Sequence, residues 1–331
     1  MKRRLGFLVA GVLAATMLAG CGSSSAGTTS GRAKTDYPTK NISIVCPYSA
    51  GGTTDLCIRG MVEAIPDGTL PSGVNMITNN VTGGGGLVGA NQFRNAASDG
   101  YTIGIVNCDL VLNQVNGNTD ISYEEFTPLA CLMKQANLIL VNANSQFDTF
   151  EDLVSYAKEH PGEVKVGNSG EGTIPRLSAE AIEKALGLEF KYVTYDGDTN
   201  SVTAIVAGEV DVTICSAAPA VGQLEAGTIK AVAVTDNERM DSFPDVPGMG
   251  ELYEELSDVH ILTWVYLACK NDVDPTCAEY LQNVFAKANE SDSFHETQKS
   301  FSIEQTEFTT SDDALGFMAD QYDFYNSLIN D

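Results

Sequence analysis

The order of apolar and polar residues along the chain predicts strands that alternate with helices. Short apolar runs typical of buried strands lie at 42–46, 74–78, 101–106, 138–141, 164–166, 189–193, 210–214, 229–234 and 262–269. Amphipathic stretches typical of helices lie at 54–64, 83–97, 153–160, 275–289 and 311–329. Thr149, with Asp152 three residues later, indicates a capped start for the helix at 153–160. Strands separated by helices of this length favour an α/β fold with parallel sheets and right-handed crossovers.

The N-terminal segment has a different pattern, which is typical of export. A basic start is followed by a short apolar run and then by Leu18-Ala19-Gly20-Cys21. This pattern predicts a signal peptide over residues 1–20. The last four residues resemble a bacterial lipobox, which would make Cys21 the lipidated first residue of the mature chain. An ordinary signal peptide beside a chance cysteine is the alternative. Residues 21–36 are rich in Ser, Gly and Thr and are expected to form a flexible tether.

Composition narrows the class of protein further. About 290 residues remain after the tether, enough for one large or two smaller lobes. The formal net charge is −25, which should repel nucleic acid and anionic lipid headgroups. The charge therefore argues against nucleic acid as a partner. The N-terminal pattern predicts an extracytoplasmic protein held at a membrane by its lipid, and we expect it to be a monomer.

The cysteines do not form a metal or redox motif. Seven follow Cys21, and no Cys-x-x-Cys spacing occurs among them. Most of them lie in or beside apolar runs, where free cysteine behaves as a small buried hydrophobe. We expect mostly buried free thiols, and a single disulfide is the alternative. No metal and no cofactor are expected.

The first candidate loop follows the strand at 42–46 and contains paired glycines. Its candidate ligand contacts are Tyr48, Ser49, Ala50, Gly51, Gly52, Thr53, Thr54 and Asp55. The glycines let the backbone approach a ligand closely, and the next helix presents free N–H groups. Such a helix N-terminus attracts anions, because its N–H groups and its dipole both favour negative charge. An ordinary turn is the alternative.

A second loop of the same design follows the strand at 164–166. Its candidate contacts are Asn168, Ser169, Gly170, Gly172, Thr173 and Arg176. It lacks the Gly-Lys-Ser/Thr ending of a phosphate-binding P-loop. Ser169 and Thr173 would either cap the next helix or donate hydroxyl groups. Arg176 in the first helical turn opposes the helix dipole, which makes sense beside an anion, but surface arginines are also common.

Further candidates lie at the ends of other strands. Tyr195 and Asp196 follow the strand at 189–193, and Asn107 follows the strand at 101–106. Tyr195 is either a pocket wall or an aromatic at the edge of the core. Ligands of α/β folds bind past the carboxyl ends of the strands. Glycine-rich helix starts on two sheets therefore indicate a cleft for a ligand with carboxylates at both ends.

With these loops in place, the chain resembles the solute receptors of tripartite tricarboxylate transporters, also called the Bordetella uptake gene family. The resemblance runs from about Tyr37 to the C-terminus. Matching stretches include Tyr37-Pro38, Gly51-Gly52-Thr53-Thr54-Asp55, 83–86, Asp99-Gly100-Tyr101-Thr102, 167–172, Gly208-Glu209-Val210-Asp211 and Pro244-Asp245-Val246-Pro247. Each piece is weak, whereas their order and spacing together are specific.

The resemblance implies a type II periplasmic-binding-protein fold with two lobes, in which mixed, mostly parallel sheets are joined by two crossover strands. It places the first lobe at 37–137 plus 263–331 and the second at 138–262. It also implies a small organic acid as ligand: a dicarboxylate, tricarboxylate, amino acid or aromatic acid. The implied partners are the large and small membrane subunits of a tripartite transporter.

Two positions depart from the family pattern. Arg176 replaces a frequent His, and Asp196 replaces the Lys of a frequent Tyr-Lys-Gly. An acid near the mouth of the cleft would suit a ligand with a cationic group, or it would point into solvent. The ligand of a close relative therefore does not predict the ligand of this chain.

Two other classes of function are alternatives to a transport receptor. An extracytoplasmic enzyme is disfavoured, because the histidines at 160, 260 and 295 belong to no catalytic or metal-binding pattern. A receptor that feeds a membrane sensor would have the same ligand chemistry, so the sequence does not separate it from a transport receptor.

Overall fold

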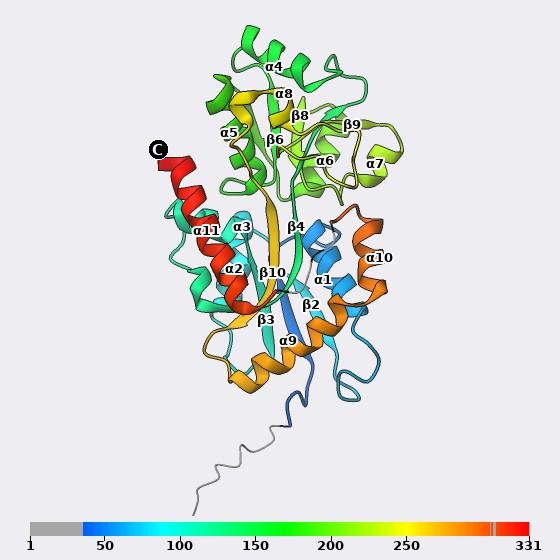
Figure 1. The fold of residues 1–331 in the computed structure, drawn as a ribbon, viewed down its shortest axis with the longest axis vertical. Coiled ribbons are helices and arrows are strands. Elements are labelled where there is room, and N and C mark those ends of the chain that lie inside the picture. Colours follow the sequence, from blue (N-terminus) through cyan, green and yellow to red (C-terminus); the bar gives the residue numbers. More distant parts are fainter. Residues whose placement is uncertain (1–35, 305, 307–308, 331) are drawn as a thin grey trace, which may run out of the picture. The chain divides into compact units, whose positions relative to one another are not determined.

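The computed structural model describes residues 36–304, 306 and 309–330, and residues 36–331 form one compact unit. Within this unit two five-stranded sheets, each covered by helices, follow one another along the long axis (Figure 1). We call the first sheet with its helices the first lobe, and the second sheet with its helices the second lobe. The predicted signal peptide, Cys21 and all but the last residue of the tether lie outside the described residues.

The first sheet has the strand order β2-β1-β3-β10-β4. The first-lobe elements are β1 (Ile42–Cys46), α1 (Thr53–Glu63), β2 (Met76–Asn80), η1 (Gly84–Gly86), α2 (Leu87–Arg94), β3 (Thr102–Asn107), α3 (Cys108–Val115), η2 (Tyr123–Glu125), β4 (Phe126–Gln135), β10 (Thr263–Lys270), α9 (Pro275–Asn289), α10 (Asp292–Ser300) and α11 (Ser311–Asn330).

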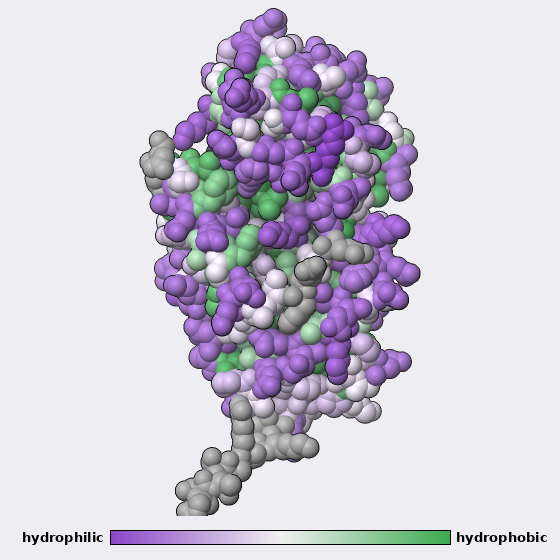
Figure 2. Space-filling view, viewed as in Figure 1, coloured by the Kyte–Doolittle hydropathy of each residue, from purple (hydrophilic) through white to green (hydrophobic). Residues whose placement is uncertain are grey.

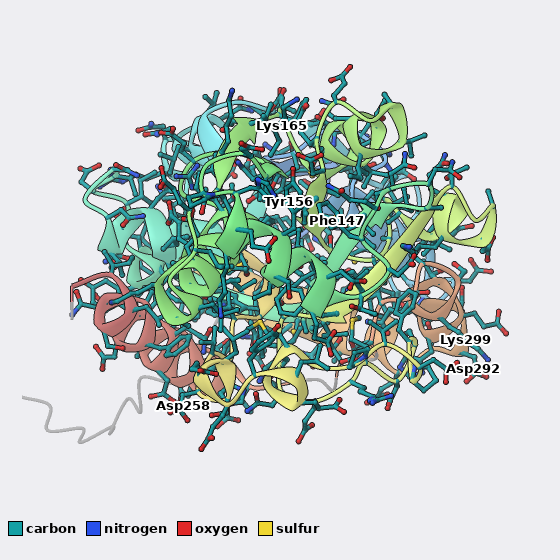
Figure 3. The ribbon with its side chains drawn as sticks, turned by 90° about the horizontal axis from the view of Figure 1, so that it is seen from above. Phe147, Tyr156, Lys165, Asp258, Asp292 and Lys299 are labelled. Carbon is teal, nitrogen blue, oxygen red and sulfur yellow. The ribbon has the colours of Figure 1, made fainter. Side chains whose placement is uncertain are left out.

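The second sheet has the strand order β7-β6-β8-β5-β9. The second-lobe elements are β5 (Leu138–Asn142), α4 (Phe150–Glu159), β6 (Lys165–Asn168), α5 (Ile174–Leu186), β7 (Lys191–Thr194), α6 (Asp198–Ala207), β8 (Val212–Cys215), α7 (Val221–Glu225), β9 (Ile229–Val234), α8 (Met249–Leu252) and η3 (Glu254–Leu256). Figure 3 looks down on this lobe and labels Phe147 and Tyr156. Their rings pack edge to face, with 5.4 Å between the ring centroids.

The two-lobed α/β prediction is confirmed, with a larger antiparallel share than strand–helix alternation indicated. Each sheet contains two parallel and two antiparallel strand pairs. The antiparallel pairs all involve β10 in the first sheet and β5 in the second. These are the strands by which the chain returns to one sheet and enters the other.

Two strands carry the chain between the sheets. Strands β4 and β10 run side by side in Figure 1, and their pairing ends at Gln135 opposite Thr263. Just beyond, Asn137 links the two connections, because its side-chain oxygen accepts a hydrogen bond from the Thr263 hydroxyl at 2.9 Å. The lobe boundaries expected above stay a prediction.

Local signals explain most element boundaries. The capping box predicted at Thr149 and Asp152 is present at the start of α4. The helix expected over 83–97 is instead a short turn followed by α2, because four consecutive glycines adopt positive φ values that an α-helix does not use. Strand β4 was not predicted. It runs into the segment where the chain changes sheets.

The cysteine prediction is confirmed for the described residues. Cys46, Cys57, Cys108, Cys131, Cys215, Cys269 and Cys277 are all buried and unpaired. Burial raises the pKa of the Cys57 thiol, so this group stays protonated at neutral pH. These thiols pack as small apolar groups.

Most of the surface seen in Figure 2 is hydrophilic, as the acidic composition leads one to expect. An apolar groove lies between α5 of the second lobe and the end of α11, and Lys184 Nζ donates to the Leu328 carbonyl across it at 3.2 Å. No helix within the described ranges combines the length and apolarity needed to span a membrane.

Candidate functional site

A cavity of about 60 Å³ lies where the carboxyl ends of the strands of both sheets meet. This is room for roughly four to six water molecules at ~10–15 Å³ each. Its walls are Tyr48, Ser49, Gly52, Thr53, Thr54, Asn107, Cys108, Asp109, Met133, Ser169, Pro175, Gly197, Asp198, Thr199, Ser216, Thr263 and Val265. Both lobes and both crossover strands therefore contribute to it.

The N-terminus of α1 faces this cavity. Gly52 is its N-cap residue, has an extended backbone and provides no side-chain cap. Thr53 and Thr54, the first two helical residues, are buried and line the cavity. The first N–H groups of a helix have no partner within the helix, so these groups are available to an acceptor in the cavity.

Asp55 belongs to the same loop but serves to hold it in place. Its carboxylate accepts hydrogen bonds from the Gly51 N–H and from Asn80 Nδ2, both at 2.9 Å, and pairs with Arg59. Burial opposes ionisation of Asp55, but these hydrogen bonds outweigh it and lower the pKa of the carboxyl. Asp55 does not line the cavity.

Replacing Asp55 by Ala is expected to destabilise the protein by about 1.5–3 kcal/mol, because its hydrogen-bonding partners lose a charged acceptor. Urea unfolding at pH 7 measures this, with exposed Asp67→Ala as the control. Because the folded pKa of Asp55 is lowered, its contribution is present above the unfolded pKa near 4 and disappears as the pH falls through the folded value. Equal stability of both variants would contradict this role.

Asp109 connects the two lobes at the cavity wall. It lies in the first turn of α3, and its Oδ2 accepts a hydrogen bond from the Tyr48 hydroxyl at 2.5 Å. Its Oδ1 accepts the N–H of Ile174, the first residue of α5, at 2.9 Å. A side chain of the first lobe thus occupies the helix start that the sequence suggested for a ligand. Burial, reinforced by the charge of Asp198, raises the pKa of Asp109 to about 6.

Asp198 faces the cavity from the second lobe. It is the first residue of α6, and its Oδ2 accepts a hydrogen bond from the Ser216 hydroxyl at 3.0 Å. Ser216 is in turn 2.7 Å from the Thr53 hydroxyl of the first lobe. Burial raises the pKa of Asp198, although part of its surface is open.

Direct contacts between the lobes show that they are closed around the cavity. Besides the Asp109–Ile174 and Thr53–Ser216 pairs, Asn113 Nδ2 donates to the Gly172 carbonyl at 2.7 Å. Gly85 lies against the Glu171 carbonyl, where even a Cβ atom would be only 3.1 Å from that oxygen. The second glycine-rich loop therefore seals the cleft against the first lobe.

The structure brings together seven of the residues predicted from sequence. Those that line the cavity are Tyr48, Ser49, Gly52, Thr53, Thr54, Asn107 and Ser169. The others in the two loops hold backbone: Asn168 Oδ1 accepts the Gly170 N–H at 3.1 Å, and the Thr173 hydroxyl donates to the Gly170 carbonyl at 2.7 Å. Ala50, Gly51, Gly170 and Gly172 contribute no lining.

The structure places three predicted residues away from the cavity walls. Arg176 Nε donates to Glu180 Oε1 at 2.6 Å, and its guanidinium stacks on the Tyr192 ring. Tyr195 packs at the edge of the second-lobe core. Asp196 is exposed. A ligand contact by any of them remains a prediction that this arrangement does not favour.

Sequence reasoning missed Asp109, Asp198 and Ser216 among the cavity residues. A usable signal existed, since each follows the carboxyl end of a strand, where α/β folds bind ligands. Thr263 and Val265 gave no such signal, because they lie within a crossover strand. In the part of the chain that the structure describes, no group of three or more His, Cys, Asp or Glu is arranged to hold a metal ion.

Two lobes that close over a cavity at the carboxyl ends of their strands, with both crossover strands in its wall, define a solute-binding receptor of the periplasmic-binding-protein class. The chain matches the family model "Tripartite tricarboxylate transporter family receptor" over residues 70–331. It belongs to this family, and it is a substrate-binding receptor and not an enzyme.

Relatives agree with this assignment. The chain is 27% identical to the "UPF0065 protein in gbd 5'region" of Cupriavidus necator, over 92% of this chain and 90% of that protein. The ligand-free structure of a TctC solute binding protein from Polaromonas is similar, with 28% identity, a TM-score of 0.66, and coverage of 89% of this chain and 99% of that one. The R. palustris protein Rpa4515, solved with adipate, shares the fold at a TM-score of 0.80 and 22% identity, over 88% of this chain and 97% of that one.

Proposed function

We propose that this receptor binds a small organic carboxylate in the interlobe cavity and delivers it to the membrane subunits of a tripartite tricarboxylate-type permease. The observation that carries the proposal is the uncapped N-terminus of α1, which faces a cavity enclosed by both lobes. The N–H groups of Thr53 and Thr54 would hold one carboxylate, and the hydroxyl groups around the cavity would hold the rest of the ligand. The adipate present in the R. palustris structure supports the same ligand class.

The closed form is the one that the permease would recognise. A ligand that contacts both lobes binds the closed form more tightly than the open one, and this difference in affinity sets how far the population shifts toward the closed form. The contacts between Asp109 and α5 and between Thr53 and Ser216 would form only on closure. The permease would then recognise a surface to which both lobes contribute.

A thermal-shift screen tests the ligand class. The panel contains dicarboxylates, tricarboxylates, amino acids and aromatic acids, with neutral sugars as controls. A ligand at 100 times its dissociation constant adds ~2.7 kcal/mol of stability, which appears as a higher melting temperature. A carboxylate that stabilises the protein supports the proposal. Stabilisation by a sugar alone would contradict it.

We also propose that Cys21 carries a lipid that holds the receptor at the outer face of a membrane. Support comes from the lipobox-like sequence before Cys21 and from membership of a family of transporter receptors. The Cys21→Ser variant is expected to leave the membrane fraction and appear in the soluble extracytoplasmic fraction. Unchanged sedimentation with membranes after Cys21→Ser would contradict the lipid anchor.

A further inference from the structure

We propose that the ligand is a small amino acid, whose ammonium group lies between Asp109 and Asp198 while its carboxylate meets the start of α1. This inference rests on the proposed carboxylate-binding function of the same cavity. It narrows the ligand class to molecules that carry both an anionic and a cationic group.

The charged side chains in the cavity wall carry the argument. Among the lining residues, Asp109 and Asp198 are the charged ones, and no Lys, Arg or His lines the cavity. A dicarboxylate that filled this cavity would bring two further negative charges next to the buried Asp109 and the partly buried Asp198. An ammonium group would instead be attracted by both.

The helix dipoles around the cavity also favour a zwitterion over a dianion. Helices α1, α3, α5 and α6 all begin at cavity-lining residues or directly beside them. Each helix N-terminus acts as about half a positive charge, so together they offset roughly the two carboxylates. The wall is then close to neutral overall, which matches a zwitterion and leaves a dianion without compensation.

The acids also have acceptor capacity left. An ionised carboxylate offers about four acceptor sites. Asp109 accepts hydrogen bonds from Tyr48 and Ile174 and a weak one from the Cys108 thiol. Asp198 accepts from the hydroxyl and the N–H of Ser216, so each acid keeps at least one acceptor site. An ammonium group has three donors and no acceptor, so it can serve both acids and one neighbouring hydroxyl. A carboxylate of the ligand cannot donate to any of them.

The pH dependence of binding follows from the groups around Asp109. The titratable groups that face it are Tyr48, Cys108, Asp198 and Tyr325, and its own pKa is raised to about 6 by burial and then by Asp198. Binding of an ammonium group needs the ionised acid, so affinity is expected to fall about tenfold from pH 7.5 to pH 5. A ligand without an amino group should lose no affinity on this account.

The test compares matched ligands by calorimetry on a chain of residues 36–331, which form one compact unit. The pairs are L-aspartate with succinate, L-glutamate with glutarate, and L-alanine with propionate. The amino member of the tightest pair is expected to bind at least tenfold more tightly. Equal or tighter binding of the deaminated member would overturn the amino-acid proposal and leave the carboxylate receptor intact. Failure of every carboxylate to bind would instead contradict the receptor function itself.

Two variants test the proposed position of the ammonium group. Asp109→Asn and Asp198→Asn are each expected to weaken amino-acid binding roughly 10- to 150-fold, the effect of losing a charged hydrogen bond, without weakening binding of the deaminated partner. Asn at position 109 keeps an oxygen for the Ile174 N–H. The matched control is Asp258→Asn, an exposed acid at the edge of the second lobe (Figure 3). If Asp109→Asn does not fold, Asp198→Asn alone decides. Wild-type amino-acid affinity in the folded variants would overturn the proposal.

Discussion

A Gly52→Val variant is expected to fold normally and to bind its carboxylate ligand about 10- to 150-fold more weakly. Gly52 has an extended backbone with φ −77° and ψ 163°, which valine adopts readily. A Cβ there would lie 3.3 Å from the Ser49 carbonyl oxygen, a tight contact that the exposed loop relieves by moving a few tenths of an ångström. The larger side chain would fill part of a cavity of about 60 Å³ and block the approach to the N–H groups of Thr53 and Thr54.

Calorimetry with the best ligand from the screen measures this effect. The control is Gly222→Val, because a Cβ at Gly222 meets no other atom within 4 Å and the residue lies away from the cavity. The melting temperature of ligand-free Gly52→Val should stay near that of the control. If Gly52→Val retains full affinity, the first loop is not part of the ligand site.

A Gly172→Ala variant is expected to bind its ligand at least about tenfold more weakly, because it cannot close fully. Gly172 has φ +72°, and a Cβ there would overlap the side-chain oxygen of Asn113 in the other lobe and lie 2.9 Å from its Cγ. If the closed population falls to about a tenth, the apparent dissociation constant rises tenfold. Small-angle X-ray scattering with saturating ligand should give a larger radius of gyration than that of the wild type.

The matched control for this variant is Gly187→Ala at the other end of α5. Gly187 also has a positive φ, +64°, but a Cβ there meets nothing within 4 Å. Both variants lose about 1–2 kcal/mol from the left-handed backbone of a residue with a side chain. Only Gly172→Ala should lose ligand affinity. Equal affinities in the two variants would show that the Gly172–Asn113 contact plays no part in closure.

Much of the fold followed from local patterns. The strand at 229–234 and the helix at 275–289 were predicted at the bounds that the structure gives for β9 and α9. These elements carry clear periodicity and clear end signals such as Pro275. By contrast, β4 leads from the first sheet toward the second, and its residues 128–133 are apolar without a break. Such a run has no alternation from which a strand could be distinguished from a buried helix.

The candidate site was predictable only in part. The loop after β1 was recognisable in the sequence from its paired glycines before a helix. Asp109 and Asp198 also follow the carboxyl ends of strands, but this signal is weaker, because an acid in the first turn of a helix is common for capping alone. Their importance comes from the meeting of two lobes that are separate in sequence. The Asp109 carboxylate reaches α5, whose first residue is 65 positions away along the chain.

Arg176, by contrast, was predicted as a ligand contact and lies away from the cavity walls. Its place in the first turn of α5 suggested an anion contact, yet its side chain turns along the helix to Glu180 and over Tyr192. The start of α5 is already satisfied by Asp109. A helix start predicts that a negative group is present, but it does not say whether the ligand or the protein supplies that group.

The most direct test of the account is a crystal structure of the protein with the best-binding ligand of the screen. The ligand is predicted to lie in the interlobe cavity, with a carboxylate within hydrogen-bond distance of the N–H groups of Thr53 and Thr54 and an amino group facing Asp109 and Asp198. A ligand bound outside this cavity, for example beside Arg176, would contradict the central claim.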